Sequence, residues 1–370
     1  MKIKAAVVHK PNAPYLIEEV ELAPPKAGEV LVKVIASGIC HTDQAMVENA
    51  LNSATFPIVP GHEGCGIVAE VGRDVRGFKP GDRVCMSFSY CGQCLPCVTG
   101  RPYGCELNMK LNFGGRCYDG TSRISLDGKD VSNLFNQSSF AAYSVTHQNN
   151  LVRIPDDIDI DMPLTAPLGC GVQTGAGTVI NYLKAVPGSA IVVFGCGSVG
   201  LSAVMAAKLC GCLQIIGVDI VDARLDLALE LGATHVVNAR KTDDTVSCVR
   251  ELTKGRGTDY AVDTTGSGLS VRQALTCTGS FGVCAMVGAT AEITIMGSAE
   301  LSGHHRTLAG IIEGHCIPSL FIPKLLNLYR DGLFPFDKLI TYYPFEQINK
   351  AAEDSLSGAA VKPVLLIEGA

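Results

Sequence analysis

Four cysteines lie within fifteen residues of one another, and glycines and prolines such as Gly92 and Pro96 supply turns between them. Four thiolates on one compact loop suit tetrahedral zinc, and a site closed by four protein ligands leaves no position for a substrate. An iron–sulfur cluster also uses cysteines, but the Cys-Pro run and second cysteine set that accompany many such clusters are absent. The spacing therefore predicts a structural zinc site formed by Cys91, Cys94, Cys97 and Cys105.

Three further ligand candidates, Cys40, His62 and Cys170, are far apart in sequence, and each has glycines close by. Two thiolates and one imidazole would leave a fourth position on zinc for water or an alcohol, as a catalytic site requires. Their spacing also fits a plainer interpretation, in which an isolated cysteine is buried filler and an isolated histidine is a satisfied polar residue. The residue types alone leave both interpretations open.

A glycine motif follows an apolar run and precedes a helical pattern, with Gly195, Gly197 and Gly200 at the spacing Gly-x-Gly-x-x-Gly. Asp219 closes the next apolar run 19 residues after Gly200. In this context the glycines permit a tight turn, close approach of the backbone to a pyrophosphate and close helix–strand packing. The carboxylate binds a ribose 2′-hydroxyl and repels a 2′-phosphate, so the motif favours NAD over NADP. The alternative is a glycine turn in another α/β protein, with Asp219 as a solvated strand end.

The elements around these residues change character along the chain. Residues 1 to about 170 contain short β-type runs, such as 30–35 and 66–72, between glycines and prolines. This pattern is typical of a β-rich domain with a barrel-like core. After about residue 172, helical patterns alternate with short strands, which predicts a doubly wound parallel sheet. A last β-type run, 360–368, is placed to rejoin the first domain. We expect an α/β protein with a zinc-binding catalytic domain, residues 1–171 and 316–370, and an inserted NAD-binding Rossmann domain, residues 172–315.

The composition limits the possible partners. A net charge of −6 over 370 residues, without a basic cluster, argues against binding to nucleic acid or to an anionic membrane surface. Residues 190–207 carry no charge, but the glycine motif inside this run indicates a buried strand and helix rather than a membrane span. Sixteen cysteines without a secretion signal favour metal ligands and buried thiols over disulfides. We therefore expect a cytoplasmic protein.

Taken together, the motifs resemble those of the zinc-containing, medium-chain alcohol dehydrogenase family. The resemblance rests on residues 61–66, the four-cysteine lobe, residues 167–171 and residues 195–200, and it covers essentially the whole chain in family order. It implies a GroES-like catalytic domain with an inserted Rossmann domain, NAD as cofactor and two zinc ions per chain. It also implies that Cys40, His62 and Cys170 hold the catalytic zinc and that the four-cysteine lobe holds the structural one.

The same resemblance assigns supporting roles. Asp43 resembles the carboxylate that orients the ligand histidine, and Glu63 resembles the acid behind the metal. His41 and Lys362 match positions that meet the pyrophosphate in relatives, and a solvated surface role is the alternative for both. The remaining implied cofactor contacts are Thr174, Val199 and Arg224, beside the glycine motif and Asp219.

The family chemistry is the reversible oxidation of an alcohol with hydride transfer to NAD. The resemblance implies that Thr42 accepts the alcohol proton and passes it to the cofactor ribose, whereas a capping or turn role is the alternative for Thr42. In well-known relatives the proton relay often ends at a histidine five residues after the first zinc-binding cysteine, and that position is Ala45 here. The proton therefore leaves through water or another group, for which His41 is a candidate.

The substrate branch is suggested by smaller features. Residues 119–123 are similar both to the aryl-alcohol (benzyl alcohol) dehydrogenase branch and to the glutathione-dependent formaldehyde dehydrogenase branch. The second branch carries an arginine where this chain has Met109, which favours a primary, benzyl-type alcohol and leaves S-hydroxymethylglutathione as the alternative. Possible pocket walls, which ordinary core packing explains equally well, are Phe88, Tyr90, Phe113 and Phe140.

Two further expectations concern the whole molecule. A nucleotide-binding structural protein that had kept the fold and lost the chemistry is a third possibility. Such a protein would be expected to lose Cys40, His62, Cys170 or Thr42 first, and all four are present. The family forms dimers and tetramers, so we expect a homo-oligomer, a tetramer or a dimer.

Overall fold

The computed structural model describes residues 1–50, 55–290 and 292–367, and the chain divides into two compact units. The first unit contains Met1–Cys170, Ile317–Asn327 and Ile340–Ala370, and the second contains Gly171–Cys316 and Leu328–Leu339. The units differ from the predicted domain boundaries chiefly in residues 328–339, which belong to the second unit. Residue 368, at the end of the predicted last strand, lies outside the described residues.

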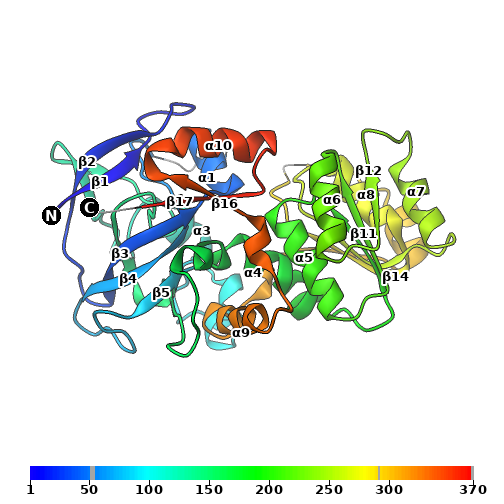
Figure 1. Ribbon diagram of the computed structural model, residues 1–370, viewed down its shortest axis with the longest axis horizontal. Coiled ribbons are helices and arrows are strands. Elements are labelled where there is room, and N and C mark those ends of the chain that lie inside the picture. Colours follow the sequence, from blue (N-terminus) through cyan, green and yellow to red (C-terminus); the bar gives the residue numbers. More distant parts are fainter. Residues whose placement is uncertain (51–54, 291, 368–370) are drawn as a thin grey trace. The chain divides into compact units, whose positions relative to one another are not determined.

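A seven-stranded sheet dominates the first unit, in the order β16-β17-β3-β4-β5-β9, with β8 also paired to β3 (Figure 1). Strand β3 lies in the middle of this sheet. Eight of its ten residues, Val30, Val32 and Val34 among them, are buried. β-Branched side chains fit such a pleated, buried surface. The strands of this sheet are β3 (Glu29–Gly38), β4 (Glu63–Val71), β5 (Arg83–Met86), β8 (Tyr143–His147), β9 (Leu151–Arg153), β16 (Ile340–Pro344) and β17 (Lys362–Leu366).

A smaller antiparallel sheet of order β1-β2-β6-β7 completes the β-rich part of the first unit. Its strands are β1 (Lys2–Val7), β2 (Leu16–Leu22), β6 (Ile124–Leu126) and β7 (Lys129–Val131). The two sheets share one apolar core, to which β1 contributes Val7, β3 contributes Val32 and the following loops contribute Phe140. The helices that lie wholly in this unit are α1 (His41–Val47), α2 (Leu95–Val98), α3 (Asn108–Phe113) and α10 (Ile348–Ser357). Helix α9 (Pro318–Arg330) begins in the first unit and ends in the second.

The second unit is built on a six-stranded parallel sheet of order β12-β11-β10-β13-β14-β15. Numbered within the unit, this order is 3-2-1-4-5-6, which defines the Rossmann fold and agrees with the expected doubly wound sheet. Strand β10 has only buried residues, as expected for a parallel strand covered on both faces. The strands are β10 (Ala190–Phe194), β11 (Gln214–Asp219), β12 (His235–Asn238), β13 (Thr258–Asp263), β14 (Thr278–Met286) and β15 (Thr307–Gly310).

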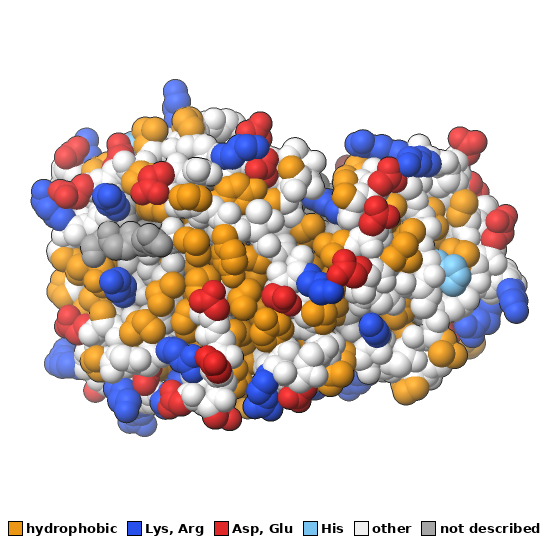
Figure 2. Space-filling view, viewed as in Figure 1, with side chains coloured by type: hydrophobic (Ala, Val, Ile, Leu, Met, Phe, Trp, Pro, Cys, Tyr) orange, Lys and Arg blue, Asp and Glu red, His pale blue; other side chains and the backbone are white. Residues whose placement is uncertain are grey.

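In the second unit α5 packs against both α4 and α6, and α7 packs against α8. They are α4 (Gly171–Gly177), α5 (Ser198–Leu209), α6 (Asp222–Leu231), α7 (Thr245–Leu252) and α8 (Gly268–Cys277). Within the described ranges, no helix has the length and apolar character needed to cross a membrane. Figure 2 shows acidic and basic side chains interspersed on the face that it draws, without a continuous basic patch.

Candidate zinc and dinucleotide sites

The pairing of β3 with β4 explains how Cys40 and His62 meet. Gly38 at the end of β3 is opposite Glu63 at the start of β4, so the residues just beyond these two strand ends are neighbours. Cys40 follows the first end and His62 precedes the second. Gly38 is required because a Cβ at this position would lie 2.1 Å from Glu63 Oε2.

Cys170 reaches the same place along a path that also requires glycine. A Cβ on Gly169 would lie 1.8 Å from the carbonyl oxygen of Met86, so the chain passes directly over the end of β5. The Ser87 hydroxyl donates to the carbonyl oxygen of Gly169 at 2.7 Å and fixes this crossing. As a result, the donor atoms of Cys40, His62, Glu63 and Cys170 all lie within 4.8 Å of one another.

Asp43 organises the cluster from within the protein. Its fully buried carboxylate accepts the Cys40 N–H at 3.0 Å through Oδ2, and Oδ1 is 2.9 Å from His62 Nδ1. Oδ1 also accepts the Gly61 N–H at 3.0 Å. His62 Nε2 is buried and has no hydrogen-bond partner among the described residues. A histidine whose Nδ1 is held by a carboxylate presents its other nitrogen to a metal, so the donor set fits zinc.

The electrostatics of the cluster agree with this fit. Hydrogen bonding from Cys170 lowers the pKa of the Cys40 thiol well below its usual range and outweighs the opposing effect of burial. Burial by itself lowers the pKa of His62, but Asp43 and Cys40 together raise it well above the usual value. The cluster therefore gathers thiolate charge beside a group that prefers to be cationic. A divalent cation would satisfy the same groups in place of the imidazole proton.

Lys362 is buried beside Glu63. The pairing of β17 with β3 carries it inward, and its ammonium donates to both oxygens of Glu63 at 2.9 Å and to the carbonyl oxygen of Ile39 at 3.0 Å. These three contacts use all three N–H groups, and only 2% of the residue is exposed. This burial does not fit the solvated alternative, and the pyrophosphate contact stays a prediction. Burial raises the pKa of Glu63 to about 7 against the opposing effect of Lys362.

Helix α1 carries the remaining predicted residues of the proton path. His41 is exposed at its first position, and Thr42 is partly exposed with its hydroxyl 3.9 Å from Cys40 Sγ. The residue at the cap position is Cys40, whose N–H is held by Asp43, so the helix gives Thr42 no capping role. Ala45 lies one turn further on and offers no group that can carry a proton.

The four-cysteine lobe forms a second cluster of donor atoms. Its four cysteines are close in sequence, so no long-range strand pairing is needed to bring them together. The Sγ atoms of Cys94 and Cys97 are 3.4 Å apart, and those of Cys94 and Cys105 are 3.9 Å apart. Tetrahedral zinc with bonds of about 2.3 Å would space its sulfur ligands at roughly 3.8 Å. The Cys91 and Cys94 N–H groups both point at sulfurs, at 3.3 Å. This geometry fits a closed zinc site.

In the second unit, the three motif glycines meet the demands made on them. Gly195 has φ +85°, which favours glycine, and a Cβ on Gly200 would lie 1.7 Å from the carbonyl oxygen of Gly195. A Cβ on Gly197 would meet no described atom within 4 Å, so the space in front of this residue is open. Helix α5 begins at Ser198 and turns its unpaired N–H groups towards that space.

Asp219 is fixed beside this loop at the end of β11. Its Oδ2 accepts the Cys196 N–H at 2.6 Å, and its Oδ1 accepts the N–H groups of Ile220 and Val221 at 2.7 and 2.9 Å. An ionised carboxylate has about four acceptor positions, so one is left for a hydroxyl. Arg224 on α6 is partly buried, and its Nε has no partner among the residues described.

The other two predicted cofactor residues flank the loop. Val199 lies in the first turn of α5, where its carbonyl oxygen would be 1.9 Å from a Cβ on Gly175. Helix α4 is thus pressed onto the start of α5. Thr174, also on α4, has its hydroxyl 3.3 Å from a carboxylate oxygen of Glu313.

Comparison with known proteins places the chain in a family. The family model described as alcohol dehydrogenase GroES-like domain matches residues 26–156, and the model described as zinc-binding dehydrogenase matches residues 198–329. A geraniol dehydrogenase from Castellaniella defragrans is 40% identical over 98% of this chain and 97% of its own length. The chain belongs to the zinc-containing medium-chain alcohol dehydrogenase family. Zinc dependence, alcohol dehydrogenase chemistry and a nicotinamide dinucleotide cofactor come with that membership.

Other relatives cover the chain equally well. An alcohol dehydrogenase 1 from Pisum sativum is 35% identical over 100% of this chain and 98% of its own length. The crystal structure of an alcohol dehydrogenase zinc-binding domain protein from Burkholderia ambifaria has a TM-score of 0.95 at 42% identity. The benzyl alcohol dehydrogenase of Acinetobacter calcoaceticus has a TM-score of 0.93 at 41% identity, and both structures match over 100% of each chain. These matches show the GroES-like and Rossmann domains that the sequence predicted.

The aromatic residues suggested as pocket walls divide into two groups. Phe88 and Phe140 are core residues of this dehydrogenase, with 2% and 0% of their surface exposed. Tyr90 and Phe113 are only partly buried and pack against the same core. Sequence reasoning missed Phe135, whose ring lies 4.6 Å from that of His62. Neither its neighbours in sequence nor any motif indicates this contact.

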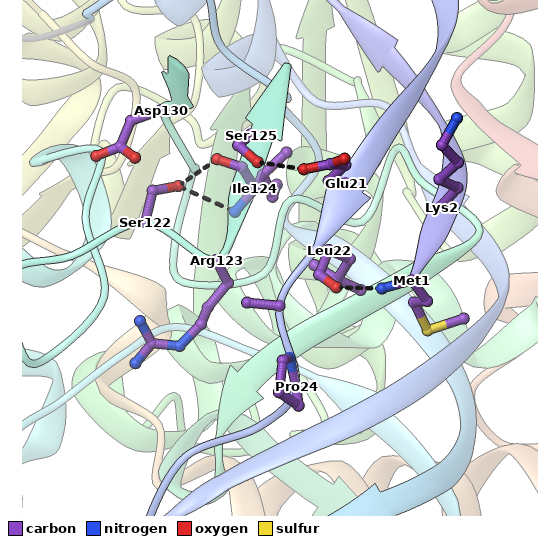
Figure 3. Close-up of a pocket in the computed structure, with 11 residues that line it drawn as sticks. Met1, Lys2, Glu21, Leu22, Pro24, Ser122, Arg123, Ile124, Ser125 and Asp130 are labelled. Carbon is purple, nitrogen blue, oxygen red and sulfur yellow. Dashed lines mark hydrogen bonds between the residues drawn. The ribbon is translucent and has the colours of Figure 1, made fainter. Parts of the chain in front are cut away.

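A hollow of about 390 Å³ on the first unit lies apart from every predicted site residue (Figure 3). Its most distinctive side chain, Arg123, donates to Glu29 at 2.7 Å and to Asp119 at 3.0 Å, so its charge is already matched. Elsewhere the hollow is lined by strands of the smaller sheet, where the Ser125 hydroxyl donates to Glu21 at 3.5 Å. This hollow has none of the donor atoms that dehydrogenase chemistry needs.

Proposed function

We propose that this dehydrogenase oxidises primary alcohols whose carbinol carbon is bonded to an unsaturated carbon, with benzyl-type alcohols foremost, and transfers the hydride to NAD. The observation that carries the proposal is the cluster of Cys40, His62 and Cys170, in which the buried Nε2 of His62 has no hydrogen-bond partner among the described residues. Two relatives at 40% and 41% identity are named for geraniol and benzyl alcohol. Both alcohols are primary, and both give a conjugated aldehyde.

The residues of the first unit divide the work of the proton transfer. Cys40, His62 and Cys170 would hold the ion that, when bound, lowers the pKa of the alcohol as a Lewis acid. Asp43 fixes both Cys40 and His62, so two of the three ligands keep their places through one carboxylate. The Thr42 hydroxyl, two residues after a ligand, is the proposed acceptor of the alcohol proton.

The second unit supplies the proposed dinucleotide site. The open space at Gly197 and the N-terminus of α5 suit a pyrophosphate. Asp219 has one acceptor position left for a ribose hydroxyl, and its negative charge disfavours a 2′-phosphate. NAD rather than NADP is therefore the proposed cofactor. Arg224, Thr174 and Val199 are proposed to lie along the same cofactor.

An apolar wall and the methionine at position 109, with Lys110 beside it, support the benzyl-type substrate. Tyr90 and Phe113 keep part of their ring surface accessible, and burial of an aryl ring contributes roughly 25 cal/mol per Å². The position at which the glutathione-dependent branch has arginine is Met109, whose side chain is 57% exposed. S-Hydroxymethylglutathione is accordingly the alternative substrate, and geraniol is a second candidate because of the 40% identical relative.

The decisive assay follows NADH formation with matched pairs of alcohols. Benzyl alcohol is compared with cyclohexylmethanol, and geraniol with citronellol, which lacks the double bond beside the carbinol. Ethanol and S-hydroxymethylglutathione complete the set, with NAD and NADP compared on zinc-counted protein. We expect higher kcat/KM for the unsaturated member of each pair and for NAD. Equal rates within both pairs would remove the substrate proposal, and a lead for the glutathione adduct would replace it.

Three whole-molecule predictions accompany the proposal. We propose two zinc ions per chain, one for each donor cluster, which elemental analysis measures. A homotetramer or dimer is expected by sedimentation equilibrium. A cytoplasmic location stays a prediction, to be tested by fractionation of the producing cells.

A further inference from the structure

Residues 134–140 form a buried loop that passes the zinc ligands of the first unit. Every one of the seven residues is buried, and three of them, Phe135, Asn136 and Ser138, have φ between +51° and +53°. Left-handed backbone is costly for residues other than glycine and persists only where the surroundings impose it. A loop of this kind calls for an explanation of what it holds in place.

Side chains of the loop tie it to its surroundings. Asn136 Nδ2 donates to the carbonyl oxygen of Leu111 at 2.6 Å, and Ser138 Oγ donates to that of Val59 at 2.7 Å. Gln137 Nε2 donates to the carbonyl oxygen of Ser87 at 2.7 Å. These bonds satisfy the polar groups of the loop and over-determine its backbone, so its side chains cannot easily shift.

The loop is also joined to the backbone just before His62. The Ser139 N–H donates to the carbonyl oxygen of Gly61 at 3.0 Å, and a Cβ on Gly61 would lie 2.4 Å from the backbone nitrogen of Phe140. Gly61 has φ +96°. The chain entering His62 is therefore held directly against the loop that carries Phe135.

This arrangement fixes the position of the Phe135 ring. It lies 4.6 Å from the His62 imidazole with the planes 32° apart, and it meets Phe113 edge-on at 5.2 Å and 75°. The backbone carbonyl oxygen of Phe135 accepts hydrogen bonds from Ser89 Oγ at 3.0 Å and from Asn150 Nδ2 at 2.7 Å. With 6% of the residue exposed, little of the ring is left for a substrate.

We infer that Phe135 is a positioning residue for His62. Asp43 holds the imidazole through Nδ1. This hydrogen bond alone still allows the imidazole ring to rotate about the Nδ1–Oδ1 direction. The Phe135 ring blocks that rotation from the face, so Nε2 stays aimed at the ion. Phe135 thus acts through a ligand and is no part of the substrate pocket. The inference rests on the proposed zinc role of His62.

The test measures zinc release to a chromogenic chelator from zinc-replete protein. Wild type is expected to release zinc in two phases, one for each donor cluster, and Cys40→Ala is expected to lack one of them. Phe135→Leu keeps an apolar side chain and removes the ring. An aromatic contact is worth roughly a 2- to 12-fold change in an equilibrium constant, so the Cys40-dependent phase should accelerate by about that factor.

Two matched variants separate positioning from packing. Phe135→Tyr keeps the ring and is expected to restore the wild-type release rate. Phe113→Leu removes the other ring contact but leaves Phe135 on His62, so its Cys40-dependent phase should stay unchanged. In steady-state assays Phe135→Leu is expected to lower kcat, with KM values for different alcohols keeping their wild-type ratios.

Each contrary outcome has one meaning. If Phe135→Leu releases zinc at the wild-type rate, or fails to fold, the ring belongs to the core and the inference is wrong. If its KM ratios among alcohols change, Phe135 is a pocket wall, which also overturns it. If wild type and Cys40→Ala release zinc identically, the proposed ligand set itself fails before Phe135 is considered.

Discussion

Replacement of Lys362 by methionine tests the buried charge balance behind the candidate zinc site. Lys362 and Glu63 have 2% and 0% of their surface exposed, and both carboxylate oxygens are 2.9 Å from Nζ. Removing one partner of a buried ion pair costs about 3–5 kcal/mol, because the other charge is left uncompensated. For a domain of this size each kcal/mol shifts Tm by about 2–4 °C, so we expect Tm to fall by about 10 °C.

The loss should also depend on pH. Burial already raises the pKa of Glu63 to about 7 in the presence of Lys362, and without that ammonium it rises further. A carboxyl with a raised pKa takes up a proton in the folded protein that the unfolded chain does not bind. Its stabilising contribution is present at low pH and is lost as pH rises through the folded pKa. The deficit of Lys362→Met relative to wild type should therefore be larger at pH 8 than at pH 6.

The assay is urea unfolding and thermal melting of zinc-replete protein, arranged as a double-mutant cycle. Glu63→Gln in the Lys362→Met background removes the uncompensated charge and should recover part of the loss, with a coupling of at least about 1 kcal/mol. Lys2→Met is the matched control, because the Lys2–Glu19 pair has a comparable distance of 2.7 Å but is exposed, and it should leave Tm unchanged. A Lys362→Met variant as stable as wild type, or strictly additive substitutions, would refute the reasoning.

Four other predictions concern single groups. Thr42→Ala should lower kcat by about 100-fold or more while Thr42→Ser retains most activity, as steady-state NADH assays measure. Asp219→Ser should raise KM for NAD and reduce the NAD over NADP preference by roughly 10-fold or more, and an unchanged ratio of kcat/KM values would contradict the ribose contact. Burial raises the pKa of Asp263 to about 6, so its stabilising effect fades as pH rises through that value. Wild type should lose about 1.4 kcal/mol relative to Asp263→Asn between pH 5 and 7.5 in urea unfolding. Cys94→Ser should remove one zinc per chain by elemental analysis and lower Tm, and a full zinc content would exclude the four-cysteine site.

The four-cysteine lobe and the glycine motif could be predicted from sequence because their residues are close together in the chain. The members of the four-cysteine lobe lie on one loop, and their separation follows from the turns between them. The glycine motif is also local, since a Cβ on Gly200 would lie 1.7 Å from the carbonyl oxygen of Gly195. Cys40, His62 and Cys170 required the family resemblance, because only the pairing of β3 with β4 and the crossing at Gly169 bring them together.

The contacts of Lys362 and Phe135 could not be predicted from sequence, because they depend on residues far apart in the chain. Lys362 is 299 residues from Glu63, and their contact depends on the last strand joining the end of β3. The sequence predicted a final strand that rejoins the first domain. It did not predict the register of that strand, which decides where the Lys362 ammonium points. Phe135 was hidden for a different reason. Its left-handed backbone is imposed by hydrogen bonds from distant residues, and no glycine marks it.

We propose that the charges behind the candidate zinc ligands account for the buried lysine. Two thiolates neutralise a divalent ion, and Asp43 adds one negative charge through His62. Glu63 without a partner would add a second, and each added negative charge nearby weakens the attraction of the ion for an alkoxide. Lys362 balances the charge of Glu63 at 2.9 Å, so an ion held by Cys40, His62 and Cys170 would keep its ability to lower the pKa of the alcohol. On this argument Lys362→Met should reduce turnover even where the protein stays folded, and a variant with zinc bound and full activity would show that the pair serves stability alone.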